Sequence, residues 1–584
     1  MPANPFPASF DLDDRNMAVG PAGQVAHRLA IEHTERLERR VWEPRPRVWS
    51  VVGNGLSNQN FIEGPDGLIC IDTGESNQEM AWSLGEIRKR TDAPVAAVLY
   101  THFHYVGGTR AVFDAEGVVP VYGHAGIEGN LQRIGGEVSA AAQRGLVHQM
   151  AILMPTDGPD GTVNLGLGRE FRHPDHAPFT REVLLPTITF QQEETHTIAG
   201  LEVVITPAPS DADDSVTFWF PELGVAVNNI LWPTLFNVFA IRGEEYRDPR
   251  LLLDGLDHLH GLEAEHLVGT HGPPISGRER IAEDVEEYRD AIQFLWDQTV
   301  RGLNRGLTTD ELTEAVQLPA TYNRSYLTRQ YYGLVEHHVR QIHSGLRGWF
   351  DGHEPSLFPV PPIERAKRLI DGFGGAGEVR RQAAAALAAT DLRWALELSS
   401  WLVRSEVDEH GRADGGTEED RRLLASVLRA IGQRTTSANV RNWVITRALE
   451  LEGSLDLARF RTHRFGQRDV LANPPEVYVR ALRVLVDPDR AEGVDDHLRW
   501  EFEDGTRVGL HVRRAVAVPT DGRDAELAMA LSLETWARIA ANKLTVAEAI
   551  EAGLLTTTGD PARISAVLDS FDHAGLATPI GGAA

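Results

Sequence analysis

Two histidines separated by one residue, His102 and His104, directly follow an apolar run, VAAVLYT, that predicts a buried strand. Histidines at this spacing just past a strand end project from one loop and can converge on a metal ion, and neutral imidazole is the commonest metal ligand in proteins. The alternative is a pair of loop histidines that bind no metal. The pair alone does not decide between these alternatives.

Cysteine chemistry contributes little to this chain. Its single cysteine, Cys70, lies in the apolar run GLICIDTG. One cysteine excludes an internal disulfide and a zinc site made of thiolates. The apolar surroundings favour a buried packing thiol over a nucleophile. Any metal site must therefore be built from histidines and carboxylates.

The elements that position the two histidines read as an α/β layered domain. The runs RVWSVVG, NQNFIEG, GLICIDTG and VVPVYGH have the length and composition of strands, and SNQEMAWSLGEIRKRT has apolar residues at helical spacing. Strands with interspersed helices continue to about Gly272. This pattern predicts stacked layers of sheet and helix with ligands bound at the strand ends.

The pattern of apolar and polar residues changes twice further along the chain. Amphipathic helical patterns begin near Ser276 and continue through residues 326–350, and alanine- and leucine-rich helices follow a proline-rich break at 356–362. After ANPPE (472–476), alternating residues around Asp504–Gly505 indicate a hairpin, followed by more helix. With about 100–200 residues per domain, we expect three domains: 1–300, 301–470 and 471–584.

The acid excess narrows the classes of partner. The chain of 584 residues has a formal net charge of -27, which argues against a nucleic acid or an anionic membrane surface as the main partner. The first residues lack the basic and apolar regions of a signal peptide, and no stretch has the ~18 apolar residues of a membrane span. We expect a cytoplasmic protein with no stable membrane insertion.

Larger motifs resemble the metallo-β-lactamase fold and, more closely, its alkylsulfatase branch. The resemblance runs through GLSNQNFIEGPDGLICIDTG, YTHFHYVGG, TPAPSDADDS and LFNVFAIRGEEYRDP to GTHGPPISGRERI. It continues into YYGLVEHHVRQIHSGLRGWFDG of the family's helical dimerisation region and into a C-terminal block similar to its sterol-carrier-protein-like domain. The resemblance implies an αββα sandwich, an all-α dimerisation domain and a small α+β domain.

The family holds two zinc ions through an HxHxDH loop, two glutamates and a later histidine, and this chain keeps part of that set. His102 and His104 match the first two histidines, but the Asp-His pair that would hold the second metal is missing. His271 matches the late histidine, and Asn229 falls where the bridging glutamate belongs. The first glutamate falls on Asp211, with two register alternatives, Asp213 and Asp214.

What remains is a complete set of ligands for one metal. An amide cannot supply the charge of a carboxylate that bridges two dications, so the resemblance implies one ion held by His102, His104 and Asp211. This set suits a catalytic zinc with open positions and equally suits the 2-His-1-carboxylate triad of Fe(II) enzymes. His271 is a fourth ligand, a hydrogen-bonding neighbour or an acid. Two metals, or none, are the alternatives.

The resemblance also implies a site for the sulfate group. Arg242 falls where the family places its sulfate-binding arginine, and Asn237 and Gly243 nearby also match. A guanidinium offers a bidentate fork to an oxyanion. The alternative is a surface arginine paired with Glu244 or Glu245.

The donor of a proton to the leaving group differs from the family pattern. The family's two histidines just upstream of the arginine fall on Pro233 and Phe236, which cannot transfer a proton. With Trp232, these residues make the site more apolar. Another acid must serve, or the chemistry differs; the candidate acids are Tyr105, His124 and His271. For Tyr105 and His124 the alternative is an ordinary loop residue.

The expected function is that of the family: metal-dependent hydrolysis of a sulfate or related ester of an apolar compound. The partners implied are one divalent metal per chain, zinc or Fe(II), a small apolar or amphiphilic substrate, and a second copy of the chain in a homodimer. Two alternatives stay open. One is a mononuclear iron enzyme that uses O2 on this scaffold, and the other is a relative without catalysis that binds a lipid-like ligand.

Overall fold

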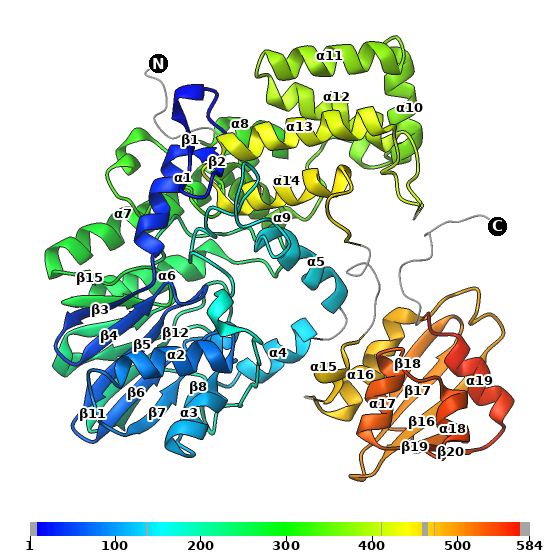
Figure 1. Ribbon diagram of the computed structural model, residues 1–584, viewed down its shortest axis with the longest axis horizontal. Helices are drawn as coiled ribbons and strands as arrows, with labels where there is room; N and C mark the ends of the chain where they lie inside the picture. The colour runs from blue at the N-terminus through cyan, green and yellow to red at the C-terminus, as the bar shows by residue number, and fades with distance from the viewer. Residues whose placement is uncertain (1–8, 136–137, 410, 458–464, 472, 573–584) are drawn as a thin grey trace. The chain divides into compact units, whose positions relative to one another are not determined.

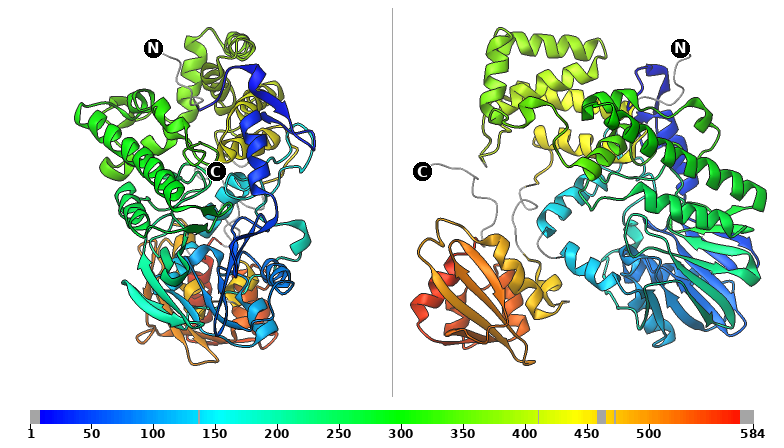
Figure 2. Two further views of the ribbon diagram at one scale, coloured as in Figure 1. Left: turned by 90° about the vertical axis from the view of Figure 1, so that its left-hand side faces the viewer. Right: turned by 180° about the vertical axis from the view of Figure 1, so that it is seen from behind.

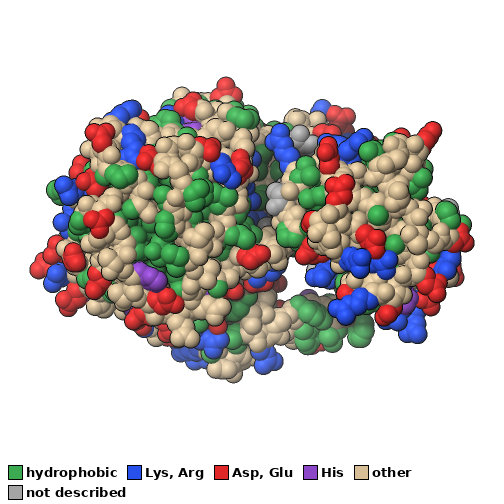
Figure 3. All heavy atoms as spheres, turned by 90° about the horizontal axis from the view of Figure 1, so that it is seen from below, with side chains coloured by type: hydrophobic (Ala, Val, Ile, Leu, Met, Phe, Trp, Pro, Cys, Tyr) green, Lys and Arg blue, Asp and Glu red, His purple; other side chains and the backbone are tan. Residues whose placement is uncertain are grey.

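The computed structural model describes residues 9–135, 138–409, 411–457, 465–471 and 473–572. Contacts divide the chain into two compact units. The first comprises Met1–Asn130, Gly145–Val403 and Thr417–Leu455, and the second comprises Leu131–Arg144, Arg404–Gly416 and Asp456–Ala584. Figure 3 shows acidic and basic side chains interspersed over the face in view, so the acid excess forms no single patch there.

One seven-stranded sheet of the first unit carries the histidine loop. Its order is β3-β4-β5-β6-β7-β8-β9, and β6 to β9 are parallel neighbours. The strands are β3 (Arg40–Arg45), β4 (Val48–Val52), β5 (Gln59–Gly64), β6 (Gly67–Ile71), β7 (Val95–Leu99), β8 (Val121–His124) and β9 (Ile188–Phe190). The runs that sequence analysis assigns to strands are β4 to β8.

A six-stranded sheet faces it, with the order β10-β11-β12-β13-β14-β15. Its strands pair antiparallel except β13 and β14, which are parallel. The strands are β10 (Glu194–Ile198), β11 (Leu201–Pro207), β12 (Val216–Phe220), β13 (Val225–Asn228), β14 (His266–Gly269) and β15 (Ile275–Ser276).

The two sheets form a sandwich with helices outside it (Figures 1 and 2). Alternate side chains of both sheets, such as Ile69 and Leu99 from one and Val203 and Phe218 from the other, fill a fully buried apolar core between them. One outer face carries α2 (Asn77–Ile87) and α3 (Thr109–Glu116), and the other carries α6 (Pro249–Gly261) and α7 (Arg278–Asn304). This is the αββα arrangement of the metallo-β-lactamase fold.

Helices dominate the rest of the first unit. They are α8 (Thr309–Ala315), α9 (Val335–Arg347), α10 (Pro362–Gly372), α11 (Ala376–Ala388), α12 (Leu392–Arg404), α13 (Glu418–Arg434) and α14 (Ala438–Leu451). The pairs α13–α14 and α8–α9 pack closely, and a shared apolar core joins these helices to α6 and α7. At the N-terminus, β1 (Met17–Val19) pairs with β2 (Val25–His27), and α1 (Arg28–His33) follows.

The helix expected over residues 326–350 begins later than its sequence pattern suggests, because α9 starts at Val335. Residues 326–334 form turns instead. The carbonyl oxygens of Tyr331 and Tyr332 accept hydrogen bonds from Ala438 N and Ser437 Oγ at the start of α14. Because these carbonyls are used as acceptors by another helix, tertiary contacts override the local helical preference.

The second unit contains a small α+β domain with its own apolar core. Its five-stranded sheet has the order β18-β17-β16-β19-β20. The strands are β16 (Asp495–Phe502), β17 (Arg507–Arg513), β18 (Val516–Thr520), β19 (Leu527–Leu531) and β20 (Leu555–Thr558). The helices are α15 (Gln467–Leu471), α16 (Pro475–Ala481), α17 (Leu533–Ala540), α18 (Val546–Glu551) and α19 (Pro561–Asp569). The predicted hairpin at Asp504–Gly505 joins β16 to β17.

The remaining α-helices of the described residues are α4 (Ile127–Gly135) and α5 (Ser139–Gln149). Among the described residues, no helix combines the length and the apolar composition needed to cross a membrane.

Candidate metal and oxyanion site

Most of the polar residues of the candidate site lie where parallel strands end; Asp211 is the exception, because it lies in the loop between the antiparallel strands β11 and β12. Asp72 directly follows β6, Thr101 and His102 follow β7, Asn229 follows β13, and His271 follows β14. Because β6 and β7 are parallel neighbours, and so are β13 and β14, the carboxyl ends of all four strands present their loops to one edge of the sandwich.

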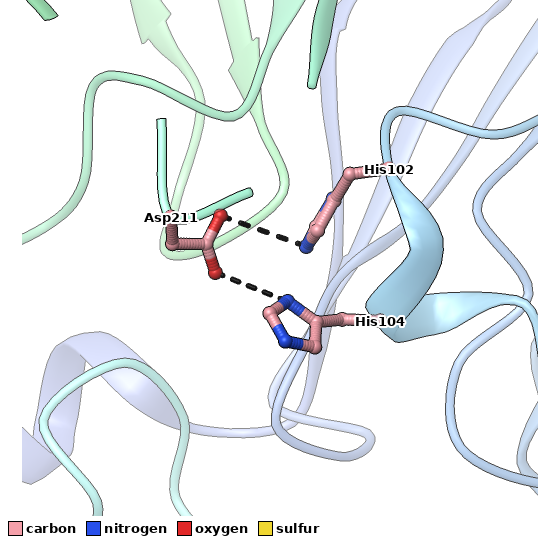
Figure 4. Close-up of side chains that lie close together, drawn as sticks. All are labelled: His102, His104 and Asp211. Atoms are coloured by element: carbon pink, nitrogen blue, oxygen red, sulfur yellow. Dashed lines mark ion pairs between the residues drawn. The ribbon is translucent and has the colours of Figure 1, made fainter. Parts of the chain in front are cut away.

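Three side chains converge at this edge, and Figure 4 shows them facing one another. His102, His104 and Asp211 each offer one ligand atom, and these atoms lie within 4.8 Å of one another. Asp211 Oδ2 is 3.1 Å from His104 Nδ1, and Asp211 Oδ1 is 3.8 Å from His102 Nε2. The carboxylate therefore stands between the two rings, in the arrangement that a shared cation needs.

The two register alternatives for the carboxylate, Asp213 and Asp214, are not part of this cluster. Asp213 accepts a hydrogen bond of 2.7 Å from Asn130 Nδ2. Asp214 is buried, and burial raises its pKa to about 7 although the nearby His104 opposes the shift. Within the part of the chain that the structure describes, Asp211 alone of the three joins the two histidines.

His102 is held in the state that a metal ligand requires. The Thr101 hydroxyl donates to Asp72 Oδ2 over 2.7 Å, so it accepts the hydrogen bond from His102 Nδ1 over 2.9 Å. The proton is thereby fixed on Nδ1, and Nε2 presents its lone pair. Nε2 is buried and has no hydrogen-bond partner among the described residues, and burial lowers the pKa of this ring to about 3.

The other two members carry opposite charges. Burial by itself would lower the pKa of His104, but the carboxylates of Asp211 and Glu244 raise it to about 9. Burial would raise the pKa of Asp211, but the two histidine rings hold it well below its ordinary value. The protein therefore places a positive charge on His104 at the point where a bound cation would supply one. This donor set fits a divalent metal.

Asn229, at the position of the family's bridging glutamate, faces this cluster. Its Nδ2 donates to Asp211 Oδ1 over 2.7 Å and reaches Ser210 Oγ and Ser215 Oγ at 3.1 and 3.2 Å. An N–H donor fixes the direction of the Asp211 carboxylate, but it repels a cation placed on its own side.

The shortened loop after His104 depends on two glycines. Gly107 and Gly108 run so close to the chain after β6 that a Cβ on Gly108 would lie 2.2 Å from Thr73 O, and one on Gly107 would lie 2.7 Å from Glu75 O. No side chain larger than hydrogen fits at either position without a shift of the backbone. Because the two chain segments run so close together, Tyr105 lies beside the metal ligands.

Tyr105 and His271 form a pair beside the metal ligands. His271 Nδ1 donates to Leu56 O over 3.0 Å, so Nε2 is the acceptor, and the Tyr105 hydroxyl lies 3.4 Å from it. Burial lowers the pKa of His271 to about 4 and raises that of Tyr105 well above 10. Among the described residues, His271 is not in the three-residue ligand cluster, and its role as a ligand stays a prediction. His124 lies half-buried, with its Nδ1 accepting from Gly126 N over 3.1 Å.

Arg242 lies at the same site in a buried group of charges. Its Nη2 contacts Glu244 Oε1, and Glu244 Oε2 contacts Arg247 Nη2. Its Nη1 donates to the hydroxyl of Tyr332 over 3.4 Å. Burial would raise the pKa of Glu244, but the charges of Arg242 and Arg247 hold it far below its ordinary value. The arginine is therefore not a surface residue, although its alternative partner Glu244 is indeed bound to it.

Two fully buried apolar rings, Trp232 and Phe236, pack beside the site. The ring centroid of Trp232 lies 4.4 Å from that of Phe236 and 5.5 Å from that of His271. Asn237 is fully buried, and neither of its side-chain polar atoms has a partner among the described residues.

The sequence did not point to two residues of the site, Asp72 and Tyr332. It also did not show that the side chain of Glu244 is turned inward. Asp72 carries a signal in the sequence, because it directly follows the apolar run GLICI; the structure adds that its backbone is left-handed, with φ 58°. Tyr332 carries none, since its approach depends on the turn before α9.

Known families match most of this chain. Residues 52–227 match the metallo-beta-lactamase superfamily, residues 308–454 the alkyl sulfatase dimerisation domain, and residues 466–577 the alkyl sulfatase C-terminal domain. These ranges follow the order of the three expected domains; the expected boundaries at 300 and 470 stay predictions.

Individual relatives carry the same names. A linear primary-alkylsulfatase of a Pseudomonas sp. is 36% identical over 493 residues, which cover 81% of this chain and 90% of that protein. An alkyl/aryl-sulfatase of Saccharomyces cerevisiae is 27% identical over 549 residues, which cover 91% and 82%. The solved structure of the stereoselective inverting sec-alkylsulfatase Pisa1 from Pseudomonas sp. superposes with a TM-score of 0.80 at 25% identity, over 95% of this chain and 91% of that one. The chain therefore belongs to the alkylsulfatase family, the metal-dependent hydrolases that join a metallo-β-lactamase fold to a helical dimerisation domain.

Proposed function

We propose that this chain hydrolyses a sulfate monoester of an apolar alcohol and that it uses one divalent cation to do so. The observation that carries the proposal is the convergence of His102, His104 and Asp211 beside Arg242, whose side chain is largely shielded from solvent. The relatives are named as alkylsulfatases, which supports the substrate class. In the overall reaction one water is consumed, the ester oxygen leaves with a proton as the alcohol, and hydrogen sulfate is released.

The cation is held by His102 Nε2, His104 Nδ1 and Asp211 in this proposal. Bound there, it supplies Lewis acidity, which can polarise a sulfate oxygen and make a water nucleophilic at neutral pH. The proposal names a single ion because Asn229 offers an N–H group toward Asp211 where a bridging carboxylate would be needed. We propose zinc, because that ion suits hydrolysis with three protein ligands.

Arg242 and Tyr332 are proposed to bind the sulfate oxygens. The Tyr332 hydroxyl accepts hydrogen bonds from Gln149 Nε2 over 2.7 Å and from Arg242 Nη1, which leaves its own proton to donate to a ligand. A guanidinium and a phenol O–H that converge in a buried site provide charge-assisted hydrogen bonds to an oxyanion. Asn237, buried without a partner for its amide among the described residues, is proposed as a further contact.

The apolar part of the substrate is proposed to pack against Trp232 and Phe236. Phe236 stands where the family has a histidine, so it contributes apolar surface and cannot transfer a proton. The hydroxyl of Tyr105 is the group that we propose to donate a proton to the leaving oxygen. Without substrate this O–H points to His271 Nε2, which is the acceptor because Nδ1 donates to Leu56 O; the phenol must turn the same proton from Nε2 to the leaving oxygen to donate it.

The test measures sulfate release from dodecyl sulfate together with the metal content of freshly purified protein. We expect about one zinc per chain and sulfate release that the H102A variant abolishes. The matched control is H196A, because His196 pairs with Glu194 on β10 outside the ligand cluster. If the protein contains its full complement of zinc but releases no sulfate from dodecyl sulfate, the proposed reaction is wrong. If it contains iron and consumes oxygen, the oxygenase alternative is supported instead.

The dimerisation-domain match also supports a homodimer. We propose that the helical region at residues 308–454 supplies its interface.

A further inference from the structure

A buried carboxylate already occupies the guanidinium that the proposed reaction assigns to the substrate. Glu244 Oε1 contacts Arg242 Nη2, and Glu244 Oε2 contacts Arg247 Nη2. The side chains of Arg242, Glu244 and Arg247 are only 11%, 14% and 3% exposed. Water screens such contacts weakly, so this is a strong internal ion pair rather than a surface contact.

The carboxylate stands between the arginine and the metal ligands. Glu244 Oε1, the same oxygen that contacts Arg242, is 3.6 Å from His104 Nε2. His104 in turn faces Asp211 through its Nδ1. A sulfate group that reached from Arg242 toward the proposed cation would therefore have to enter the space that Glu244 now fills.

A carboxylate and one edge of a sulfate group are chemically equivalent partners for a guanidinium. Each offers oxygens to the planar N–H fork in the same geometry. Both carry negative charge, so they repel each other if they are bound side by side. Binding of the substrate's oxyanion to Arg242 and binding of Glu244 to Arg242 Nη2 are therefore competing events.

Glu244 has a second partner to which it can remain attached. Arg247 Nη1 donates to Asn237 O over 2.6 Å, so this guanidinium is anchored to the backbone independently of Glu244. When Arg242 is taken by a ligand, the carboxylate can keep its contact with Arg247 and does not become an unpaired buried charge.

We propose that Glu244 is a specificity-determining residue: it is an internal anion that the oxyanion of the substrate displaces from Arg242. This inference rests on the proposed function. Displacement costs every anion alike, but an ester with an apolar tail recovers that cost through contacts with Trp232 and Phe236, whereas free sulfate does not. The carboxylate thus selects amphiphilic esters over small anions and favours release of the sulfate product.

The test is calorimetric titration of inorganic sulfate into the full-length wild-type protein and the E244Q variant at equal metal content and ionic strength. Glutamine keeps the shape of the side chain and removes its charge. We expect E244Q to bind sulfate about tenfold more tightly, and product inhibition of turnover by sulfate to strengthen in parallel. Unchanged or weaker binding by E244Q, or no sulfate binding by either protein, would overturn the inference and leave Glu244 as a residue that merely holds Arg242 in place.

Two controls make the result specific. E116Q removes a different partly buried carboxylate, one that pairs with Arg88 and not with Arg242. This variant should leave the affinity for sulfate unchanged. The double variant R242A/E244Q should lose the gain in affinity, because the guanidinium is the group for which the two anions compete.

The outcomes also separate this inference from the proposed function. Titration with inorganic sulfate requires no turnover. If E244Q gains sulfate affinity but the wild type releases no sulfate from dodecyl sulfate, the competition stands and the proposed reaction falls. If dodecyl sulfate is hydrolysed but E244Q binds sulfate no better than the wild type, the reaction stands and the competition falls.

Discussion

At the scale of single residues, the site is built from hydrogen bonds that fix where each proton lies. The chain Asp72–Thr101–His102 is the clearest case: burial raises the pKa of Asp72 to about 7, and above that pH the ionised aspartate only accepts and sets the direction of both hydrogen bonds. Asn229 does the same for Asp211 with an amide donor. These neighbours decide which atoms are free to bind a cation.

The Thr101 hydroxyl is therefore expected to matter for metal affinity although it touches no metal. Replacing Thr101 by valine keeps the shape of the side chain but removes the acceptor for His102 Nδ1, so either tautomer of the ring becomes accessible. We expect T101V to weaken zinc binding by about 10–100-fold, measured by competition with a chromophoric chelator.

The matched control is Thr217 on β12, which is fully buried and whose hydroxyl has no partner among the described residues. T217V should leave zinc affinity unchanged. Equal zinc affinity in T101V and the wild type would show that Thr101 does not orient the ring.

At the scale of elements, the start of α2 holds a carboxyl group in an unusual state. Glu79 is buried, and its Oε1 and Oε2 accept hydrogen bonds from Gln59 Nε2 over 2.7 Å and Glu75 N over 3.1 Å. A Cβ on Gly74 would lie 2.3 Å from Glu79 Oε1, so the carboxyl group is packed tightly beneath that glycine. Burial, with a further contribution from the charge of Glu75, raises the pKa of Glu79 to about 8.

This shift makes the stability of the first unit depend on pH. Between the ordinary glutamate pKa of 4.5 and about 8, the folded state keeps a proton that the unfolded state has lost, so the Glu79 contribution to stability falls as pH rises. In E79Q this loss is absent. We expect the thermal midpoint of E79Q minus that of the wild type to increase by about 5 °C from pH 5 to pH 8, measured by scanning calorimetry. A difference that does not change with pH would contradict the neutral carboxyl group.

Parallel strand ends explain why residues far apart in sequence share one site. The loops after β6, β7, β13 and β14 carry Asp72, His102, Asn229 and His271 to one edge of the sandwich. The helical region has no such strand ends and contributes to the site through a turn. Tyr332 reaches Arg242 only because the chain before α9 is not helical.

At the scale of the whole molecule, an exposed apolar segment joins α9 to α10. Trp349 and Phe358 are 68% and 89% exposed, and Phe350, Leu357 and Val360 are also exposed. The segment lies within residues 308–454, which match the dimerisation domain. Large apolar side chains gathered on one segment are typical of an interaction surface.

We expect these side chains to be buried in a homodimer. The double variant W349S/F358S should remain folded and elute as a monomer at micromolar concentration, whereas the wild type should elute as a dimer, as measured by light scattering on a gel-filtration column. The control V118S removes another strongly exposed apolar side chain, 83% exposed on the loop after α3, and should remain dimeric. A monomeric wild type would reject the dimer, and a dimeric double variant would place its interface elsewhere.

Features that depend only on neighbours along the chain can be predicted from the sequence. The strands β4 to β8, the hairpin at Asp504–Gly505 and the pair His102–His104 after a buried strand follow from period, turn chemistry and spacing, and the family motifs supplied the order of the domains. These features are local, so they can be predicted without knowing what packs against them.

Three features emerge only from the folded chain: Asp211 is the aspartate that meets the histidines, residues 326–334 are not helical, and Glu244 turns inward onto Arg242 and Arg247. Each of these depends on groups that are distant in sequence. The free energy of burying a charge is set by the partners it finds there, and no pattern along the chain reports those partners.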